Sequence, residues 1–337
     1  MGNVVLGLDV GGANLKAATA DGRSSAVPFA LWKQPAGLTA ALQSLIAQFE
    51  PIGDIAATMT GELCDCFATK AEGVTHIVRA IQLAAAGKPV RVWSLDGEFV
   101  APERAIEWPM AVAASNWHAL ATWIGMKFPN DALLLVDVGS TTADVIPLSH
   151  GRILAAGRTD SERLEHGELV YIGMKRTPLC ALLPSGRHCA EWFATTHDAY
   201  VLVGWLPEEP SLMETADGRA MTIPLARARV ARMIGGDDST VSLEEAKHLA
   251  VEAIGLMKLL LLDAAGRQLA KWPVGERPVL LASGLGERLV RESLQGIDWA
   301  DVRSLGEILG SGLSEVAPAF AVANLATKSS APIASGG

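Results

Sequence analysis

The sequence has few cysteines, no excess of basic residues and no long uninterrupted hydrophobic run, and each absence excludes a class of protein. Lysine and arginine total 28 against 37 aspartates and glutamates, so the chain lacks the basic surface that a nucleic-acid partner requires. Four cysteines in 337 residues are too few for a disulfide framework and fit no regular zinc spacing, which indicates a reducing compartment. They are Cys64, Cys66, Cys180 and Cys189.

The sequence also predicts no targeting leader and no membrane-spanning segment. No basic leader is visible, and Asp9 lies inside the first apolar run. The most apolar helix expected, residues 250–265, contains Glu252, Lys258 and Asp263 and is too short to cross a bilayer comfortably. We therefore expect a cytoplasmic protein whose partners are small molecules, without a nucleic-acid or membrane partner. A homo-oligomer remains open.

The chain is long enough for two domains, and its composition favours helices around sheets. Half of its residues are hydrophobic, with many alanines and leucines, which favour helices. An internal duplication, described next, sets the expected boundaries. We expect an N-terminal domain at 1–130, a C-terminal domain at 131–326, and a disordered tail of Ser, Ala, Pro and Gly at 327–337.

The duplicated stretch is an apolar run that ends in Asp-Val-Gly and is followed by small residues and a second apolar run. It occupies residues 6–16 and recurs 128 positions later, so that Asp9 corresponds to Asp137 and Gly11 to Gly139. By the same shift, Lys16 corresponds to Asp144. One glycine turn would be a weak signal, but a matching pair near the start of each half predicts two similar domains that face each other across a cleft.

Each copy predicts a β-hairpin with a tight turn of nearly side-chain-free residues. Small residues let backbone N–H groups approach an anion closely, and hydroxyl groups in the second copy add donors. The predicted phosphate-binding residues are Gly11, Gly12, Ala13 and Asn14 in the first hairpin and Gly139, Ser140, Thr141 and Thr142 in the second. Asp9 and Asp137, at the two strand ends, are placed to hold a hydrated Mg²⁺ against phosphate oxygens.

A second candidate for chemistry is the segment 60–73, which follows a short buried strand at 54–59. Ligands of open α/β sheets sit at the carboxyl ends of strands, and the segment contains Glu62, Asp65, Lys70 and Glu72. The alternative interpretation is a solvated helix start with Thr60 as its N-cap.

Four other positions carry polar or special residues with an ordinary structural explanation beside a functional one. Asn116 lies in an Ala-rich helix and is either a buried hydrogen bonder or a substrate contact. Arg176 lies, together with Lys175, in a basic loop that either meets a diphosphate or is solvated. Asp198 sits in a helix first turn, where capping alone explains it. Gly284 follows a strand and opens a helix towards a ring or a phosphate.

The periodicity predicts alternating strands and helices, with a charged and exposed stretch at 158–168. The expected strands are 4–9, 15–20, 26–31, 54–59, 89–94, 132–136, 153–155, 169–172, 191–194 and 278–283. The expected helices are 38–49, 73–86, 110–125, 195–204, 225–234, 242–262 and 313–325.

These features resemble the actin-like ATPase superfamily, which includes sugar kinases, DnaK-type chaperones and the hydantoinase/oxoprolinase group. The paired hairpins, Asn116 with its helix, and the turn at 283–286 carry this resemblance. The more specific stretches at 59–73, 171–178 and 198–200 resemble the family tied to the tetrahydromethanopterin-linked one-carbon pathway, whose archaeal members act in methanofuran biosynthesis. The resemblance covers residues 3–325. It implies an α/β fold of two actin-like, ribonuclease H-like domains.

The resemblance also implies an activity, the condensation of a (5-aminomethylfuran-3-yl)methyl diphosphate with the phenol of γ-glutamyltyramine. An ether forms and pyrophosphate leaves. Mg²⁺ is the implied cofactor, and ATP is possible but not required. The implied catalytic residues are Lys16, Glu62, Lys70 and Asp144, and the implied substrate contacts are Asp65, Asn116, Arg176, Asp198 and Gly284. Which of Glu62, Lys70 and Asp198 takes the phenol proton or holds the aminomethyl group is left open.

Two other functions remain open at this point because fold alone does not choose among them. One is an ATP-dependent small-molecule kinase or a hydantoinase/oxoprolinase-like enzyme. The other is a nucleotide-binding module without turnover. The first hairpin has Ala13-Asn14 where many relatives carry Thr or Ser pairs, a departure that weakens the case for ATP. The charged segment at 60–73 weighs against a pure nucleotide clamp.

Overall fold

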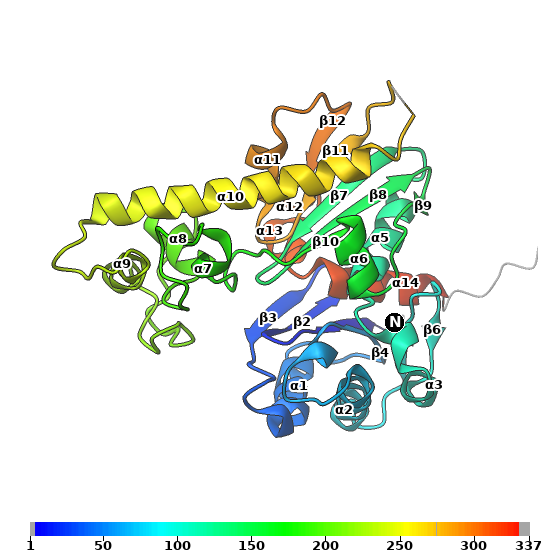
Figure 1. Cartoon of the computed structure of the whole chain (residues 1–337). Helices are drawn as coiled ribbons and strands as arrows, with labels where there is room; N and C mark the ends of the chain where they lie inside the picture. Colours follow the sequence, from blue (N-terminus) through cyan, green and yellow to red (C-terminus); the bar gives the residue numbers. More distant parts are fainter. Residues whose placement is uncertain (1–3, 274, 330–337) are drawn as a thin grey trace, which may run out of the picture. The chain divides into compact units, whose positions relative to one another are not determined.

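The computed structural model describes residues 4–273 and 275–329 (Figure 1). Contacts divide the chain into two compact units that interleave along the sequence. Unit 1 comprises residues 1–133, 147–162 and 303–337, and unit 2 comprises residues 134–146 and 163–302. The two units therefore differ from the domains expected at 1–130 and 131–326, because residues 147–162 and 303–337 belong to unit 1. Those limits, which rest on the duplication, stay a prediction.

Unit 1 is built on a six-stranded sheet in the order β3-β2-β1-β4-β5-β6. The strands β1, β2 and β3 are antiparallel, β4 and β5 continue parallel to β1, and β6 returns antiparallel. All six residues of β1 are buried, because it lies in the middle of the sheet with helices on both faces. The strands are β1 Val5–Val10, β2 Asn14–Thr19, β3 Ser24–Pro28, β4 Asp54–Met59, β5 Val90–Trp93 and β6 Phe99–Val100.

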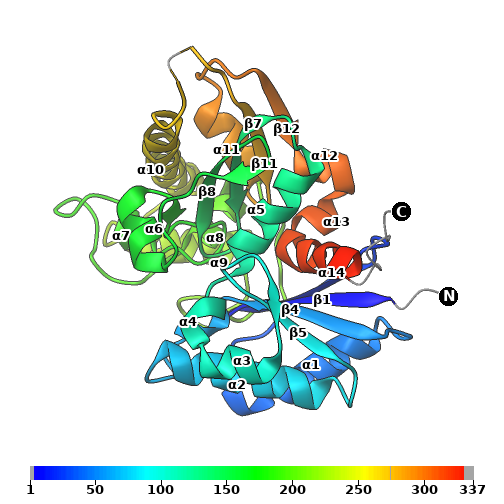
Figure 2. The ribbon, with the colours of Figure 1, turned by 90° about the vertical axis from the view of Figure 1, so that its right-hand side faces the viewer.

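The helices of unit 1 cover both faces of this sheet. Figure 2 shows α1, α2 and α3 on one face and α14 on the other, with α5 beside α14. A Cβ atom on Gly7 of β1 would lie 2.9 Å from the carbonyl carbon of Ala319, so α14 approaches β1 backbone to backbone. The helices are η1 Pro35–Gly37, α1 Leu38–Ala47, η2 Gly61–Leu63, α2 Lys70–Ala84, α3 Pro102–Glu107, α4 Pro109–Val112, α5 Asn116–Lys127, α12 Leu305–Leu309, α13 Ser311–Ser314 and α14 Ala317–Ser329.

The second sheet has the order β10-β8-β7-β11-β12, and β9 pairs with β8. Its central strands are almost completely buried, as expected for apolar runs of four to seven residues covered on both faces. The strands are β7 Ala132–Val138, β8 Ala143–Ser149, β9 Arg152–Ile153, β10 Leu169–Val170, β11 Val279–Ser283 and β12 Asp301–Ser304.

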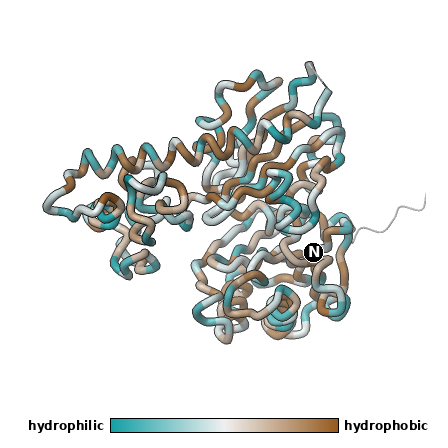
Figure 3. The backbone as a smooth tube through the Cα atoms, viewed as in Figure 1, coloured by the Kyte–Doolittle hydropathy of each residue, from teal (hydrophilic) through white to brown (hydrophobic). Residues whose placement is uncertain are grey.

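Unit 2 also contains a helical lobe, made of α7, α8, α9 and the N-terminal half of the long helix α10 (Figure 1). Hydrophobic and hydrophilic residues alternate along α10 in Figure 3, since one side of the helix packs against the lobe and α11 while the other is exposed. Ser242 and Glu245 cap α10 reciprocally, as the capping-box sequence predicts. The helices are α6 Asp160–His166, α7 Leu179–Leu182, α8 Thr196–Leu202, α9 Ile223–Arg232, α10 Leu243–Leu269 and α11 Glu287–Leu294.

Most expected elements are present, and the differences have identifiable causes. The stretch at 158–168 is mostly exposed, as expected, but it contains α6, and its Arg163 and Glu168 are buried against the expectation. The helix expected at 110–125 is broken, because Ala114 adopts φ +48° between α4 and α5.

Smaller errors concern strand and chain ends. Residues 191–194 form no strand, and the strand expected at 26–31 is β3 at 24–28. The disordered tail was expected to begin at residue 327, but residues 327–329 still belong to α14. The rest of the expected tail, 330–337, lies outside the described residues.

Candidate active site

The first hairpin joins β1 to β2 and turns its carbonyl groups towards the end of β3. The N–H of Gly11 donates to the carbonyl of Asn14 at 3.0 Å, and the carbonyls of Gly12 and Ala13 accept from Leu31 and Phe29, both at 2.9 Å. Within the described residues, the N–H groups of Gly12 and Ala13 donate to no other protein group. They are therefore available to an anion.

The second hairpin, between β7 and β8, repeats this geometry. The N–H of Gly139 donates to the carbonyl of Thr142 at 2.9 Å, the same bond shifted by the spacing of the duplication. The loop that follows β10 packs on the hairpin, because Met174 donates its N–H to Gly139 and Arg176 donates its N–H to Ser140, both at 3.0 Å. Arg176 itself is exposed. The structure thus places this predicted substrate residue at the predicted phosphate hairpin through its backbone.

The two aspartates predicted to hold metal lie at the ends of β1 and β7. Asp9 is buried and directly opposite Lys16 in the β1–β2 ladder, which puts both side chains on the same face of the sheet. Asp137 faces Gly284, where a Cβ atom would lie 2.8 Å from Asp137 Oδ1 and 2.5 Å from the carbonyl oxygen of Val138. The predicted residues Asp137 and Gly284 are thus brought together.

The donor set at these positions fits Mg²⁺ rather than a metal that needs a protein cage. In the described part of the chain, no cluster of three or more His, Cys, Asp or Glu side chains is arranged to share a metal ion. Mg²⁺ commonly takes one or two carboxylates, keeps several waters and completes its shell with substrate phosphates. A strand-end aspartate beside a hairpin that is predicted to bind phosphate would supply what that mode of binding requires.

The segment 60–73 lies directly against the first hairpin. A Cβ atom on Gly61 would be 3.2 Å from the carbonyl carbon and oxygen of Gly11. Thr69, and not the expected Thr60, caps the helix that follows, because its side chain accepts from the N–H of Glu72. Lys70 begins α2, and its Nζ lies 2.7 Å from Asp160 Oδ2. Asp160 belongs to α6, which the sequence pattern did not predict.

Glu62 is the most unusual carboxylate of this segment. Its side chain is buried, with 1% of the residue exposed, and among the described residues neither carboxylate oxygen has a hydrogen-bond partner. Burial raises the pKa of Glu62 to about 7, an effect that the nearby Lys70 opposes and Asp160 reinforces. A carboxylate with a pKa near neutrality and unused lone pairs is equipped for proton transfer at physiological pH.

The backbone at Ala114, between α4 and α5, also influences the pKa of the Glu62 carboxylate. The N–H groups of Glu62 itself and of Ala114 make no hydrogen bond of normal geometry to the carboxylate, but their dipoles act to lower the pKa of Glu62. Ala114 has φ +48°, a left-handed conformation that costs an alanine about 1 kcal/mol. The next residue, Ser115, is buried and donates to the carbonyl of Trp93 at 3.0 Å while bonding Thr58 at 2.9 Å, which holds the strained turn in place.

Two of the predicted site residues are held in buried ion pairs. Asp144 Oδ1 lies 2.9 Å from Arg163 Nη1, with both side chains nearly inaccessible. Asp198 Oδ1 accepts from Arg229 Nε at 2.7 Å, and its Oδ2 accepts from the N–H of Thr195 at 2.9 Å. Burial raises the pKa of Asp198, and Arg229 opposes that rise. The structure accounts for both carboxylates without a ligand, so their roles in substrate chemistry stay predictions.

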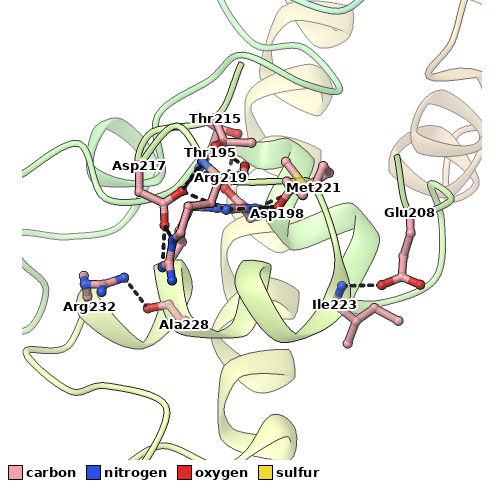
Figure 4. A network of polar contacts seen from close by, with 12 residues as sticks. Thr195, Asp198, Glu208, Thr215, Asp217, Arg219, Met221, Ile223, Ala228 and Arg232 are labelled. Atoms are coloured by element: carbon pink, nitrogen blue, oxygen red, sulfur yellow. Dashed lines mark hydrogen bonds and ion pairs between the residues drawn. The ribbon is translucent and has the colours of Figure 1, made fainter. Parts of the chain in front are cut away.

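Figure 4 shows the polar network around Asp198 in the helical lobe. Arg229 also contacts Asp217 Oδ1 at 3.0 Å, and Asp217 accepts from Arg219 Nε at 2.7 Å. Burial opposes ionisation of Asp217, but the hydrogen bonds from Arg219 and Arg229 lower its pKa to about 2. The network ties the loop before α9 to α8 and so sets the shape of the lobe.

The remaining predicted substrate residues are less constrained. Asp65 is exposed, and Asn116 is half-buried at the start of α5. Sequence reasoning missed Asp160, Arg163, His197, Glu209 and Arg229, because their partners lie far away in sequence. The only signal for them was the charge of the stretches that contain them.

The chain is similar to proteins of known activity over almost its whole length. The hydantoinase/oxoprolinase family matches residues 54–259. A protein of Methanocaldococcus jannaschii is 31% identical over 336 residues, which cover 96% of this chain and 98% of that protein. The chain belongs to the hydantoinase/oxoprolinase family. The relative carries the name (4-{4-[2-(gamma-L-glutamylamino)ethyl]phenoxymethyl}furan-2-yl)methanamine synthase, and a Methanococcus vannielii protein of the same name is 28% identical over 57% of this chain and 89% of its own length.

Solved structures bear on the fold of this family member. Acetone carboxylase, whose acetone carboxylation is ATP-dependent, aligns with a TM-score of 0.57 at 12% identity, over 95% of this chain and 70% of that chain. The α/β fold of actin-like type predicted from the sequence is confirmed. Over residues 4–273 and 275–329, none of the helices has the length and apolar character that crossing a bilayer requires.

Proposed function

We propose that this chain joins a (5-aminomethylfuran-3-yl)methyl diphosphate to the phenol oxygen of γ-glutamyltyramine, releasing pyrophosphate. The name of the M. jannaschii relative describes an aryl ether of this kind, a phenoxymethyl furan with an aminomethyl group. The observation that carries the proposal is Glu62, a buried carboxylate with unused oxygens and a pKa of about 7 beside the first hairpin. The reaction needs a base next to a diphosphate site, and this arrangement supplies one.

In the proposed reaction, the carboxylate of Glu62 takes the phenol proton as the phenol oxygen bonds to the furanylmethyl carbon. The bond between that carbon and the diphosphate oxygen breaks, and its electron pair leaves with pyrophosphate. The N–H groups of Gly12 and Ala13 and the ammonium of Lys16 stabilise the negative charge that develops on the leaving group. Asp9 at the first hairpin, and Asp137 at the second, would each hold Mg²⁺, which would supply Lewis-acid stabilisation of phosphate oxygens bound there.

Burial sets the raised pKa of Glu62 in this scheme, and Lys70 and Asp160 adjust it in opposite directions. Because Lys70 is already paired with Asp160 at 2.7 Å, it does not neutralise Glu62 by direct contact. Glu62 therefore keeps a high pKa and remains a base that is matched to neutral pH.

We further propose Mg²⁺ as the cofactor, no requirement for ATP, and a cytoplasmic location. In the described part of the chain, the four cysteines form no disulfide, which supports a reducing compartment. The N–H donors of both hairpins are backbone groups and serve a diphosphate as well as a nucleotide.

The test is a pyrophosphate-release assay with the furanylmethyl diphosphate, γ-glutamyltyramine and Mg²⁺, without ATP. We expect the ether product and one pyrophosphate per ether. Glu62→Gln should lower kcat by a factor on the order of 100 to 10,000 and remove an acidic limb with an apparent pKa of about 7 from the pH–rate profile.

The matched control is Glu72→Gln, an exposed glutamate of the same segment that accepts from the N–H of Ala68. It should retain wild-type kcat. Formation of ADP on addition of ATP, with no ether in its absence, would contradict the proposal and favour an ATP-dependent enzyme of the same fold.

A further inference from the structure

We propose that Lys175 is a phosphate-binding residue of the second hairpin. While no anion is bound, the ammonium group of Lys175 pairs with Glu209 instead. The inference rests on the proposed role of that hairpin in holding phosphate, but not on ether formation.

The backbone of Lys175 is fixed at the hairpin. Its N–H donates to the carbonyl of Ser140 at 3.0 Å. Gly173 makes this approach possible, since a Cβ atom there would lie 2.5 Å from the carbonyl carbon of Ser140. The flexible four-carbon stem of Lys175 therefore begins next to backbone donors that face an anion.

The side chain of Lys175 points instead to an acceptor in the helical lobe. Its Nζ lies 2.6 Å from Glu209 Oε1, and both side chains are about one-third exposed. An ion pair of this exposure is weak, whereas the charge-assisted hydrogen bonds between a lysine and a phosphate are stronger. A phosphate at the hairpin therefore competes successfully for the ammonium group.

Glu209 has a second neighbour, a histidine that makes no hydrogen bond to it in this structure. His197 is buried, and its Nε2 lies 3.4 Å from the same Oε1 atom. Burial, Lys175 and Arg229 lower the pKa of His197 to about 4, and Glu209 opposes them, so the imidazole is neutral at pH 7. When the ammonium group of Lys175 moves to a phosphate, it no longer lowers the pKa of His197. The imidazole then accepts a proton more readily beside Glu209.

The experiment measures binding of inorganic pyrophosphate with Mg²⁺ to the full chain by calorimetry. Lys175→Met should weaken binding about tenfold. Glu209→Gln should strengthen it about threefold, because it frees the lysine. The double variant should match Lys175→Met, because Glu209 acts only through Lys175.

The matched controls are Lys258→Met and Glu292→Gln. This pair has the same 2.6 Å separation and nearly the same exposure in the same unit, but it has no backbone bond to the hairpin. Both controls should bind pyrophosphate like the wild type.

A second readout is the pKa of His197, followed by NMR. It should rise in Lys175→Met and also when Mg²⁺ and pyrophosphate are added to the wild type, a change that a permanent structural ion pair would not show.

Unchanged binding in Lys175→Met, or weaker binding in Glu209→Gln, overturns the inference. If the wild type binds pyrophosphate through Lys175 but forms no ether, the proposed function fails and the inference stands. If ether forms while Lys175→Met binds like the wild type, only the inference fails.

Discussion

Gly73 lets the first turn of α2 lie directly against the backbone of Glu62. A Cβ atom on Gly73 would be 2.7 Å from the Cα atom of Glu62, a separation that real Cβ atoms do not tolerate. The position of the candidate base therefore depends on the absence of a side chain eleven residues later in the chain.

Gly73→Ala should destabilise the protein and reduce activity together. The added methyl group forces Glu62 or α2 to move, which costs about 1–3 kcal/mol of the free energy of unfolding, and the displaced carboxylate loses its alignment. Thermal unfolding and pyrophosphate release measure the two effects. Gly255→Ala on α10 is the control, because nothing lies within 4 Å of its added Cβ and alanine favours helices. A Gly73→Ala variant with wild-type stability and rate would contradict the contact.

Glu62→Gln should make the protein more stable at alkaline pH. The pKa of Glu62 rises from 4.5 in the unfolded chain to about 7 in the folded protein, so the folded state binds the extra proton between these values. Wild-type stability should therefore fall as pH rises from 4.5 to 7, and the variant should be free of this loss. At pH 8 the gain should be about 3 kcal/mol at most, and at pH 4 close to zero. Urea unfolding at several pH values measures the difference, and a gain that is independent of pH would count against the buried carboxylate.

Arg229→Met should loosen the helical lobe without unfolding the rest of the chain. It leaves Asp198 buried without its cation, which costs about 3–5 kcal/mol. Hydrogen exchange in α8 and α9 should accelerate strongly, while exchange in β1 and β4 should stay unchanged. Arg232→Met, in the last turn of α9, removes only a bond to the carbonyl of Ala228 and should leave exchange near wild type. Equal effects of both changes would show that Asp198 does not depend on Arg229.

Gly284→Ala should abolish Mg²⁺-dependent pyrophosphate binding at the second hairpin. The methyl group would collide with Asp137 Oδ1 and the carbonyl of Val138, displacing the proposed metal ligand. Gly204→Ala separates this collision from backbone strain, because Gly204 also has a positive φ, +71°, but nothing lies within 4 Å of its Cβ position. That control should lose only about 1 kcal/mol of stability and bind pyrophosphate normally. Calorimetry checks both variants, and binding retained in Gly284→Ala would remove Asp137 from the metal site.

The hairpins were predictable because their signal is local. The Asp-Val-Gly pattern and its repeat specify strand, turn and strand within about ten residues each, and the bonds of Gly11 and Gly139 appear where the pattern predicts. The segment at 60–73 was predicted as a candidate site because it follows the carboxyl end of a strand, and its role in chemistry stays a prediction. These parts need no knowledge of distant residues.

The missed features depend on partners that are remote in sequence. Arg163 and Glu168 are buried because Asp144 and Lys271 pair with them, so charge alone wrongly suggested exposure. Ala114 interrupts a helix although alanine is the strongest helix former, and only the surrounding bonds of Ser115 force its conformation. Neither effect leaves a mark in the local pattern.

The backbone contact between Gly7 and Ala319 also constrains how the protein is made. The strand β1 emerges from the ribosome well before α14, the helix that covers it. Until then the nascent chain exposes an apolar face of its central strand, which invites chaperone binding and aggregation. Unit 1 therefore completes its fold only after synthesis has passed α14, and slow translation of the second half prolongs the vulnerable interval.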